Sequence, residues 1–464
     1  MRKLRWLAIL MAFALVAAAC GGDDAAETTT TAAADESTTT AAGEETTTTA
    51  AGSALEGTLK VLLHQNPPLV EYMEGFNERF MAAHPGVEIE MEIVNANDQA
   101  TAIQTRLTAG EVDVIDFCPA PCSAFSNPIQ PYMTGANPPL WQQLIDAGLV
   151  ADLTDEAFVA NYDQTALEDA GSYNGRVYAL PAGRVSYSGM FVNNDVLASA
   201  GVALPTTWSE LVAACEAITA SGNECMTLGG ADGWPVFVGA YGLLGAFYPD
   251  QEALVEGLWT GDIKWNDDNM LELWRRYQIY ATELLEDGVT GISHDAGPAR
   301  FAAGDVAFMP TGVWQGPAVE DAAPGFDWTY VPFPGSDDPA DNQYLFGKYD
   351  MSWMVAEDAD NKEAAIAYLA ALSDPAEYQM FVDAVGFLPT QPTATLDSQL
   401  GRAVAPLLAN YRVGFEQYWV QPTGAGQWAN GSQGAAWFAP FNEWTDPVEL
   451  ANQAQADLEA GLGS

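Results

Sequence analysis

The sequence predicts an α/β fold with two lobes. From residue 57 onward, strand-like segments alternate with helix-like segments, a pattern typical of chains that build a mainly parallel sheet. Residues 57–464 also exceed the length at which one hydrophobic core usually stops growing, which favours two lobes. The chain before residue 57 has a different composition and indicates where the protein is found.

The N-terminus has the layout of a secretory signal. Arg2, Lys3 and Arg5 form a charged start, and an apolar stretch follows from Trp6 to Val16. This stretch is shorter than the about 20 residues that a membrane-spanning helix needs. We therefore interpret residues 1–20 as a signal segment and expect the protein to be exported.

Small residues lead to a cysteine at the end of this segment, Ala17-Ala18-Ala19-Cys20. The arrangement resembles the lipobox of bacterial lipoproteins, although those usually carry Leu where Ala17 stands. We expect lipid on Cys20, which would hold the protein on the outer face of the cell membrane without a spanning segment. The alternative is an ordinary signal that is cut nearby, with Cys20 lost or idle.

Residues 21–56 consist almost entirely of Thr, Ala, Gly, Asp and Glu, with four consecutive threonines at 28–31 and again at 46–49. Such a segment has too few large apolar side chains to offset the entropy lost on ordering. We therefore predict a disordered tether between the anchor and the body.

The first part of the body shows alternating strands and helices. Residues 58–63 form a strand-like run, and a helical segment follows to about Ala83. Over residues 87–93 apolar side chains alternate with glutamates, which predicts a half-buried strand. A helix over about 99–109 and a short strand over 112–116 complete this unit.

Three later helices have clear start signals. Thr207, Asp374 and Asp446 are each followed three residues later by a glutamate, the spacing of a capping box. Gly222 provides a stop for the first of these helices. Trp208 and Trp274 fall on helical stripes, so we expect both in the core.

The chain is strongly acidic, with a formal net charge of −47 from 16 basic and 63 acidic residues. Nucleic-acid binding is excluded, because no basic surface is available to replace phosphate counterions. The charge is weak evidence against a multiply anionic ligand, and we interpret most of it as solvation.

Four cysteines follow Cys20, an even number that suits disulfides in an exported protein. Sequence proximity favours Cys118 with Cys122 and Cys215 with Cys225, out of three possible pairings. Metal binding by the first two is the alternative, but none of the three histidines is close to them in sequence. We expect structural disulfides, no metal and no cofactor.

Six segments, taken in chain order, carry a family resemblance: residues 175–181, 189–201, 205–211, 301–314, 331–335 and 386–390. The succession GRVYALP, GMFVNN, DVLASAG and PTTWSEL is the most specific part, and residues 301–314 end in Gly-Val-Trp. Together they resemble the extracellular solute-binding proteins of ABC importers, in the branch that includes maltose-binding protein.

The resemblance implies a type II periplasmic-binding-protein-like fold whose two lobes are joined by three crossings. Residues 57–181 plus 332–390 would form lobe 1, and residues 182–331 plus 391–464 would form lobe 2. Solute would sit between the lobes, which close over it by hinge motion and present it to the permease subunits. It also implies a monomer that is a binder and not an enzyme.

Aromatic residues are the first candidates for ligand contact. A sugar ring offers an apolar face and a rim of hydroxyls, so a sugar site needs flat aromatic side chains surrounded by polar groups. Trp428 and Trp437 lie in a C-terminal stretch of that composition, and similarity to maltose-binding protein adds Trp314. Trp234 is a further candidate. The alternative for each is a place in the core.

Polar candidates come from positions after predicted strands, where parallel sheets present their ligand-binding edge. These positions are Gln65, Asp116, Arg184 and Asp350. Asp116 could instead cap a helix or accept hydrogen bonds within its loop. Contacts from Arg184 or from Lys348 would carry weight, because positive charges are scarce in this chain.

The sequence thus predicts a lipid-anchored extracellular component of an ABC importer that captures a sugar or oligosaccharide. One alternative is another solute, such as a polyamine, an amino-acid derivative or glycerol phosphate. A second alternative is a secreted glycoside hydrolase, which needs two carboxylates about 5–10 Å apart. With 63 acidic residues such pairs arise by chance, and the sequence shows no nucleophile elbow, zinc-protease helix or P-loop.

Overall fold

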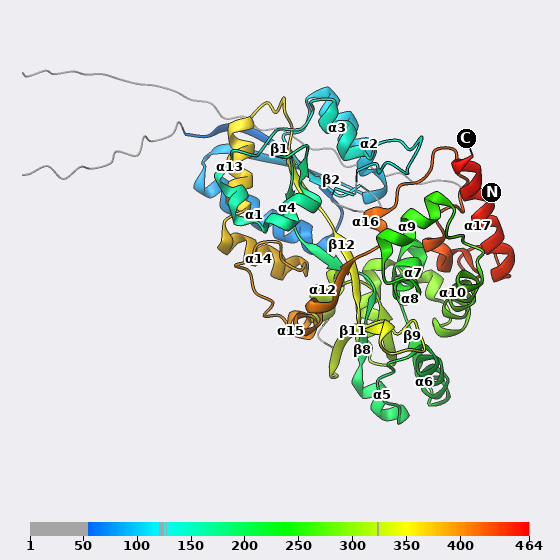
Figure 1. The fold of residues 1–464 in the computed structure, drawn as a ribbon. Coiled ribbons are helices and arrows are strands. Elements are labelled where there is room, and N and C mark those ends of the chain that lie inside the picture. The colour runs from blue at the N-terminus through cyan, green and yellow to red at the C-terminus, as the bar shows by residue number, and fades with distance from the viewer. Residues whose placement is uncertain (1–53, 120–124, 127, 323, 464) are drawn as a thin grey trace, which may run out of the picture. The chain divides into compact units, whose positions relative to one another are not determined.

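The computed structural model describes residues 54–463 apart from 120–124, 127 and 323 (Figure 1). The predicted signal segment with Cys20, most of the tether, and Cys122 lie outside the described residues. Within the described residues, no helix has both the length and the apolar character that crossing a membrane requires.

A five-stranded sheet forms the centre of the first lobe. Its strands are, in order, β2 (Gly86–Val94), β1 (Glu56–His64), β3 (Val114–Phe117), β13 (Ser352–Val355) and β6 (Leu180–Pro181). β1 pairs in parallel with both β2 and β3. Helices α1 (Pro67–Ala83) and α2 (Ala96–Ala109) supply the two connections, because parallel neighbours need a crossover segment.

Side chains next to these helices determine where they begin and end. Asn66 caps α1 by accepting a hydrogen bond from Leu69 N at 3.3 Å, and Asn95 caps α2 by accepting one from Asn97 N at 3.0 Å. Gly110 ends α2 in the left-handed conformation, with φ 68°. The predicted strands and helices of this unit are confirmed, with β3 shifted toward its C-terminal end.

A four-stranded sheet forms the centre of the second lobe. Its strands are, in order, β11 (Trp328–Pro332), β8 (Gly189–Asn193), β10 (Val306–Pro310) and β9 (Glu224–Met226). β8 is antiparallel to β10 and β11, whereas β9 and β10 are parallel. Helices α5 (Asn194–Ala200) and α6 (Trp208–Ala220) lie beside this sheet (Figure 1).

The other elements are shorter or connect the sheets. The α-helices are α3 (Leu140–Asp146), α4 (Gln164–Ala170), α7 (Trp234–Gly239), α8 (Tyr241–Phe247), α9 (Gln251–Thr260), α10 (Asp268–Ile279), α11 (Gly297–Ala302), α12 (Gly316–Asp321), α13 (Lys362–Leu372), α14 (Pro375–Val385), α15 (Gln399–Val404), α16 (Phe415–Tyr418) and α17 (Pro447–Leu462). The 3₁₀ helices include η1 (Ala157–Asn161), η6 (Val313–Gln315), η8 (Ala405–Asn410) and η9 (Gly431–Trp437). β4 (Ser172–Tyr173) and β5 (Arg176–Val177) form a hairpin.

Both large sheets are mixed, whereas the sequence predicted mainly parallel ones. In the first sheet β13 runs antiparallel to β3 and to β6. β6 leads out of the first lobe and β13 returns from the second, so no local helical crossover joins either strand to β3. The constraint that makes β1, β2 and β3 parallel is therefore missing for these two strands.

The chain passes between the two large sheets three times, and a small sheet ties these passages together. The passages run from β6 to β8, from β11 to β13, and from α14 to α15. The small sheet consists of β14 (Tyr411–Val413), β12 (Leu345–Tyr349) and β7 (Arg184–Ser186). Leu388 of the third passage exchanges two backbone hydrogen bonds of 2.8 Å with Arg184. The predicted two-lobe fold with three crossings is confirmed.

The three predicted capping residues begin α6, α14 and α17. The Thr207 side chain accepts a hydrogen bond from Glu210 N, and Asp374 and Asp446 accept from the first-turn amides of their helices. One detail differs from the predicted capping box. The Glu210 carboxylate accepts from Thr206 N at 2.9 Å instead of reaching the cap residue itself.

The core of the second lobe includes two phenylalanines that the predicted lobe boundaries assign to lobe 1. Phe333 and Phe346 are 2% and 3% exposed within this core. Gly242 and Gly245 of α8 make room for them, since a Cβ at these positions would lie 2.4 Å and 2.2 Å from the two side chains. The lobe boundaries remain a prediction. The packing of Phe333 and Phe346 favours a return of the chain to the first lobe after these residues, later than the predicted boundary at residue 332.

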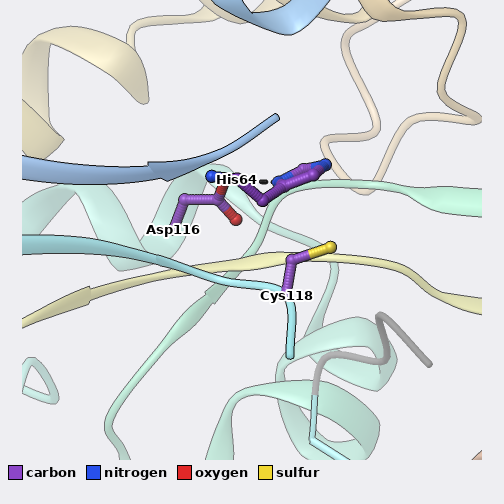
Figure 2. Close-up of side chains that lie close together, drawn as sticks. All are labelled: His64, Asp116 and Cys118. Carbon is purple, nitrogen blue, oxygen red and sulfur yellow. Dashed lines mark hydrogen bonds and ion pairs between the residues drawn. The ribbon is translucent and has the colours of Figure 1, made fainter. Parts of the chain in front are cut away.

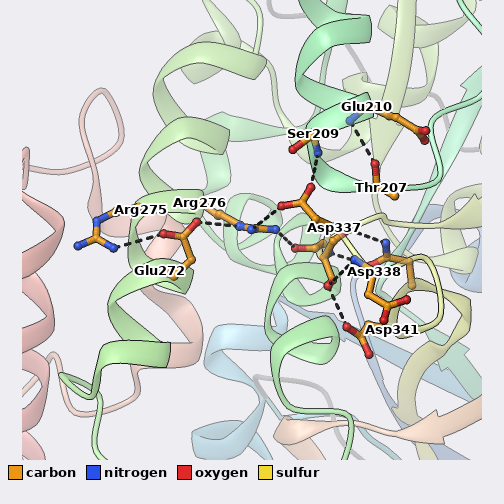
Figure 3. A network of polar contacts seen from close by, with 12 residues as sticks. Thr207, Ser209, Glu210, Glu272, Arg275, Arg276, Asp337, Asp338 and Asp341 are labelled. Carbon is orange, nitrogen blue, oxygen red and sulfur yellow. Dashed lines mark hydrogen bonds and ion pairs between the residues drawn. The ribbon is translucent and has the colours of Figure 1, made fainter.

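Arg276 of α10 fastens the loop after β11 to the second lobe (Figure 3). Its guanidinium donates to Gly335 O at 2.7 Å, to Asp337 Oδ2 at 3.0 Å and to Glu272 Oε1 at 3.2 Å. Asp337 Oδ1 also accepts from Ser209 N at 2.9 Å, in the first turn of α6. A single buried cation therefore joins α10, α6 and the start of the second passage.

Candidate functional site

Two ionisable side chains are buried together where β1 and β3 end. His64 is the last residue of β1, and its Nδ1 lies 2.5 Å from Asp116 Oδ2 (Figure 2). The same oxygen accepts a hydrogen bond from His64 N at 2.9 Å. The two residues are 5% and 0% exposed. Parallel strands place their carboxyl ends at one edge, which is why residues 52 positions apart meet here.

The His64–Asp116 contact has the electrostatics of an ion pair. Burial disfavours a charged imidazole, but Asp116 and the more distant Asp350 attract the proton more strongly, so the pKa of His64 is raised. Asp116 Oδ1, by contrast, is buried and has no hydrogen-bond donor within residues 54–119, 125–126, 128–322 and 324–463. The carboxylate therefore has one oxygen engaged by His64 and one available to a donor.

Helix α2 holds the end of β3 in place through one glutamine. Gln99 is fully buried, and its side-chain amide donates to the Asp116 carbonyl oxygen. Its amide oxygen accepts a hydrogen bond from Cys118 N at 2.8 Å. Gln99 thus positions Asp116 through a hydrogen bond to the Asp116 backbone carbonyl. Both oxygens of the Asp116 carboxylate remain free of this interaction.

Figure 2 also shows Cys118 beside His64 and Asp116, and the possible ligand atoms of the three residues lie within 4.8 Å of one another. A metal site of this kind would need a thiolate. Cys118 is disulfide-bonded, so its sulfur is not a thiolate and the donor set does not fit a metal. Its predicted partner Cys122 lies outside the described residues, so that pairing stays a prediction.

The other predicted pair of cysteines is present as a disulfide. Cys215 of α6 and Cys225 of β9 are bonded, with their Cα atoms 5.0 Å apart. The bridge lies in the core of the second lobe and does not contribute to the polar site.

A second buried ion pair comes from β12 and α16. Lys348 Nζ lies 3.0 Å from Glu416 Oε2 and 3.8 Å from Asp350 Oδ1. Glu416 Oε1 accepts a hydrogen bond from Tyr241 OH at 2.8 Å. Lys348, Asp350 and Glu416 are all at most 8% exposed. One of the 16 basic residues of this chain is thus committed to the interior.

Asp350 connects the two pairs electrostatically. Burial raises its pKa to about 6, while Lys348 and His64 oppose this rise and Asp116 and Glu416 add to it. All four neighbours therefore act on one carboxyl group. We call these five residues, His64, Asp116, Lys348, Asp350 and Glu416, the charged cluster.

Gln417 adds a second buried acceptor close to the charged cluster. Its side-chain amide donates to the Phe125 carbonyl oxygen, in the segment after β3, and its Oε1 has no donor among the described residues. Asp116 Oδ1 is in the same state, so one orphaned acceptor comes from the first-lobe sheet and one from α16. Buried polar atoms are nearly always paired, so both oxygens can take a donor from a ligand.

Two predicted polar residues lie outside the charged cluster. Arg184 is half-buried in the small sheet, where its Nη2 donates to Pro389 O at 3.3 Å and its guanidinium lies 5.3 Å from the Tyr411 ring centroid. Gln65 directly follows His64 but its side chain is exposed, and its backbone N–H donates to Val94 O at 2.7 Å.

Trp234 and Trp314 meet in the second lobe. Their ring centroids are 6.2 Å apart, and Trp234 also packs on His294 at 4.4 Å. Trp314 lies over Gly312, where a Cβ would come within 1.9 Å of the indole. Burial lowers the pKa of His294 to about 4, so its ring is neutral at physiological pH. Both tryptophans are half-buried.

Trp428 and Trp437 pack with other tryptophans of the second lobe. Trp437 is 7% exposed and stacks on Trp274 at 6.1 Å. Trp428 is half-buried and contacts Trp437 and Trp444 edge-on, at 5.0 Å and 5.9 Å. Trp208 and Trp274 are in the core as predicted.

A cavity of about 450 Å³ opens beside the segment after β3. Its walls include Trp141 of α3, Tyr173 of the β4–β5 hairpin and Asp169 of α4. Asp169 Oδ2 accepts a hydrogen bond from Tyr349 OH at 3.2 Å, which links this wall to the small sheet. Sequence reasoning missed this cavity, because its walls come from four segments without a shared motif.

Comparison with known proteins places this geometry in context. The chain is 22% identical over 306 residues to the multiple sugar-binding protein of Streptococcus mutans, covering 64% of this chain and 67% of that protein. The structure is similar to SBP RafE in complex with raffinose, with TM-score 0.66, 20% identity and coverage of 87% and 98% of the two chains. A chitin oligosaccharide binding protein gives TM-score 0.68 at 18% identity, with coverage of 88% and 100%.

At these identities the solved structures establish the fold, which is the two-lobe α/β fold of type II periplasmic binding proteins. The family assignment comes from a family model, described as bacterial extracellular solute-binding protein, that matches residues 66–379. This range extends from the start of α1 into α14 and includes both large sheets except β1. With more than half of the chain matched, the protein belongs to the bacterial extracellular solute-binding protein family.

Proposed function

We propose that this protein is the lipid-anchored solute-capture component of an ABC importer and that its solute is a sugar or oligosaccharide. Membership of the solute-binding family supports the capture role. The names of three similar proteins refer to multiple sugars, raffinose and chitin oligosaccharide, and they support the solute class.

The observation that carries the proposal is a pair of orphaned acceptors, one on Asp116 of the charged cluster and one on Gln417, which follows Glu416 in the chain. Asp116 Oδ1 and Gln417 Oε1 are buried oxygens without a hydrogen-bond donor in the part of the chain that the structure describes, and they come from elements of different lobes. Sugar hydroxyls are strong donors that can bridge two such oxygens. A solute that does so stabilises the closed arrangement of the lobes more than the open one, which is the requirement for capture by closure.

The half-buried residues Trp234 and Trp314 would supply the aromatic part of the proposed chemistry. A sugar ring has one apolar C–H face, which packs well on an indole, while its hydroxyls reach polar groups at the rim. The three passages between the lobes would act as the hinge, and the small sheet beside them takes β7 from the first passage and β12 from the second.

A sugar panel measured by isothermal titration calorimetry tests the solute class. The purified Cys20→Ser protein, which carries no lipid at that position, is titrated with glucose, maltotriose, raffinose and chitotriose. We expect heat of binding from at least one sugar. A response only to spermidine, glycerol 3-phosphate or amino acids would move the solute to another class, and release of reducing sugar from any substrate would contradict a pure binder.

A matched pair of variants tests the site. Asp116→Asn keeps the size of the side chain but removes its charge, and we expect sugar affinity to fall about tenfold or more through the loss of a charge-assisted hydrogen bond. Asp360→Asn is the control, because the Asp360 side chain is 69% exposed and forms its ion pair with Lys60, which is not part of the charged cluster. Equal affinities for the two variants would remove Asp116 from the site.

The anchoring part of the proposal rests on Cys20, which lies outside the described residues. Cells expressing the full chain are labelled with an alkyne-bearing fatty acid. We expect the label on the wild-type protein and not on the Cys20→Ser variant, which should also leave the membrane fraction. Label on neither protein would show an ordinary signal segment instead.

A further inference from the structure

The chain makes an excursion out of the first lobe between β3 and α3. β3 belongs to the first sheet, and Trp141 of α3 is buried with residues of that sheet. Between them, Met133 is 2% exposed inside the hydrophobic core of the second lobe. We call residues 128–137 the strap.

Several contacts seat the strap on the second lobe. Ile129, Tyr132 and Ala136 pack against the same core as Met133. Thr423 Oγ1 donates a hydrogen bond of 2.8 Å to Gly135 O. Tyr132 lies close enough to α9 for Glu256 and Glu252 to add to the effect of burial in raising its pKa. The root of the strap is also held, because Gln417 donates to Phe125 O.

The strap is stiff by sequence and by its internal hydrogen bonds. Pro128 and Pro131 restrict the backbone of the strap, and Pro138 and Pro139 restrict the two positions that directly follow it. Met133 N donates to Gln130 O at 2.9 Å, and Gly135 turns the chain with φ 79°. A pre-formed segment loses little conformational entropy when it docks. Most of the favourable free energy of its buried contacts is therefore available to hold the lobes together.

We propose that the strap is a latch on the opening of the two lobes, independent of the three crossings. For the lobes to separate, Met133 has to leave the core of the second lobe, and the Thr423–Gly135 and Gln417–Phe125 hydrogen bonds have to break. The latch shifts the protein toward the closed arrangement and lengthens the residence of a captured solute. This role rests on the proposed solute capture, but its first step concerns the empty protein and needs no solute.

The test measures lobe separation in the empty protein. Spin labels are attached to cysteines introduced at Glu78 of α1 and Glu216 of α6, both exposed, in the Cys20→Ser protein. Double electron–electron resonance then gives the distribution of distances between the lobes. With Met133→Ser we expect the ratio of open to closed populations to rise roughly tenfold or more, the factor that one buried methionine supplies.

Two further variants keep the result interpretable. Met380→Ser is the matched control, because Met380 is 47% exposed on α14, and it should leave the distribution unchanged. Thr423→Val removes the hydrogen bond that the Thr423 hydroxyl donates to the strap from an exposed position, so it should widen the distribution slightly even if Met133→Ser fails to fold.

The possible outcomes test the latch proposal separately from the proposal that the solute is a carbohydrate. A distribution that neither Met133→Ser nor Thr423→Val changes would overturn the latch, whether or not sugars bind. A widened distribution in a protein that gives no heat with any sugar would keep the latch and overturn the carbohydrate assignment.

Discussion

Lys348 Nζ lies 3.0 Å from Glu416 Oε2, and each of these two side chains is only 5% exposed. Burying such a pair is costly, but removing one partner costs more because the other charge stays in the interior. The pair joins β12 on the second passage to α16 of the second lobe, beside the two orphaned acceptors. The free energy of this buried pair therefore affects the stability of the proposed site.

Replacing Glu416 tests this pair. Glu416→Ala should lower the free energy of unfolding by about 3–5 kcal/mol, because Lys348 loses its nearest carboxylate while it stays buried. Urea unfolding followed by circular dichroism measures the change. The control is Asp360→Ala, which removes the partner of the partly exposed Lys60 and should cost far less. Similar losses for both variants would show that the interior pair is not desolvated.

The raised pKa of Asp350 predicts how the free energy of unfolding depends on pH. Burial raises its pKa from 3.8 to about 6, so the folded protein binds a proton that the unfolded chain releases. The contribution of Asp350 to the free energy of unfolding therefore falls as pH rises from about 4 to about 6 and is constant above that range.

Asp350→Asn removes this contribution. Relative to the wild type, the variant should gain stability over the same interval, by roughly 3 kcal/mol in total. Urea unfolding at pH 4, 5, 6 and 7 measures the difference, and Asp155→Asn at an exposed position is the control. Stability curves of wild type and Asp350→Asn that run parallel with pH would rule out the raised pKa.

The chain has only three histidines, so their titrations can be followed individually by NMR. We expect the pKa of His64 above 6.5, because the attraction of Asp116 and Asp350 outweighs burial, and the pKa of His294 near 4, because burial dominates there. His84→Gln assigns the third resonance, and Asp116→Asn should lower the pKa of His64. A His64 that titrates below His294 would contradict the ion pair.

The absence of a side chain at Gly312 leaves the space in which the Trp314 indole lies. Gly312→Ala places a Cβ where the indole now lies, at a distance of 1.9 Å, so the ring has to move. If Trp314 contacts the sugar, affinity should fall roughly tenfold, with a change in tryptophan fluorescence and an intact fold. Gly325→Ala is the control, because a Cβ there meets nothing within 4 Å. Unchanged binding in Gly312→Ala would place Trp314 outside the site.

Local features of the fold were predictable from the sequence. Thr207, Asp374 and Asp446 were recognised as helix starts because a cap and its amides lie within three residues of each other. The directions of β13 and β6 were not, because they depend on where the chain returns after leaving a lobe.

The candidate site was found in part. Asp116 and Asp350 were identified from their positions after strands, and both lie in the charged cluster. Glu416 and Gln417 were missed, because they are ordinary polar residues in a four-residue helix. His64 was also missed as a candidate, although it stands next to the predicted Gln65 and ends the same strand.

By itself, the sequence determined the α/β class, the first strands and helices, the capping residues and the family resemblance, since each depends on neighbouring residues or on motif order. Only the tertiary structure decided which side chains from distant segments meet in the interior. The His64–Asp116 pair, the burial of Lys348 with Glu416 and the docking of Met133 on the second lobe all join segments that are distant in sequence. Such contacts follow from the packing of the whole chain, and no local pattern encodes them.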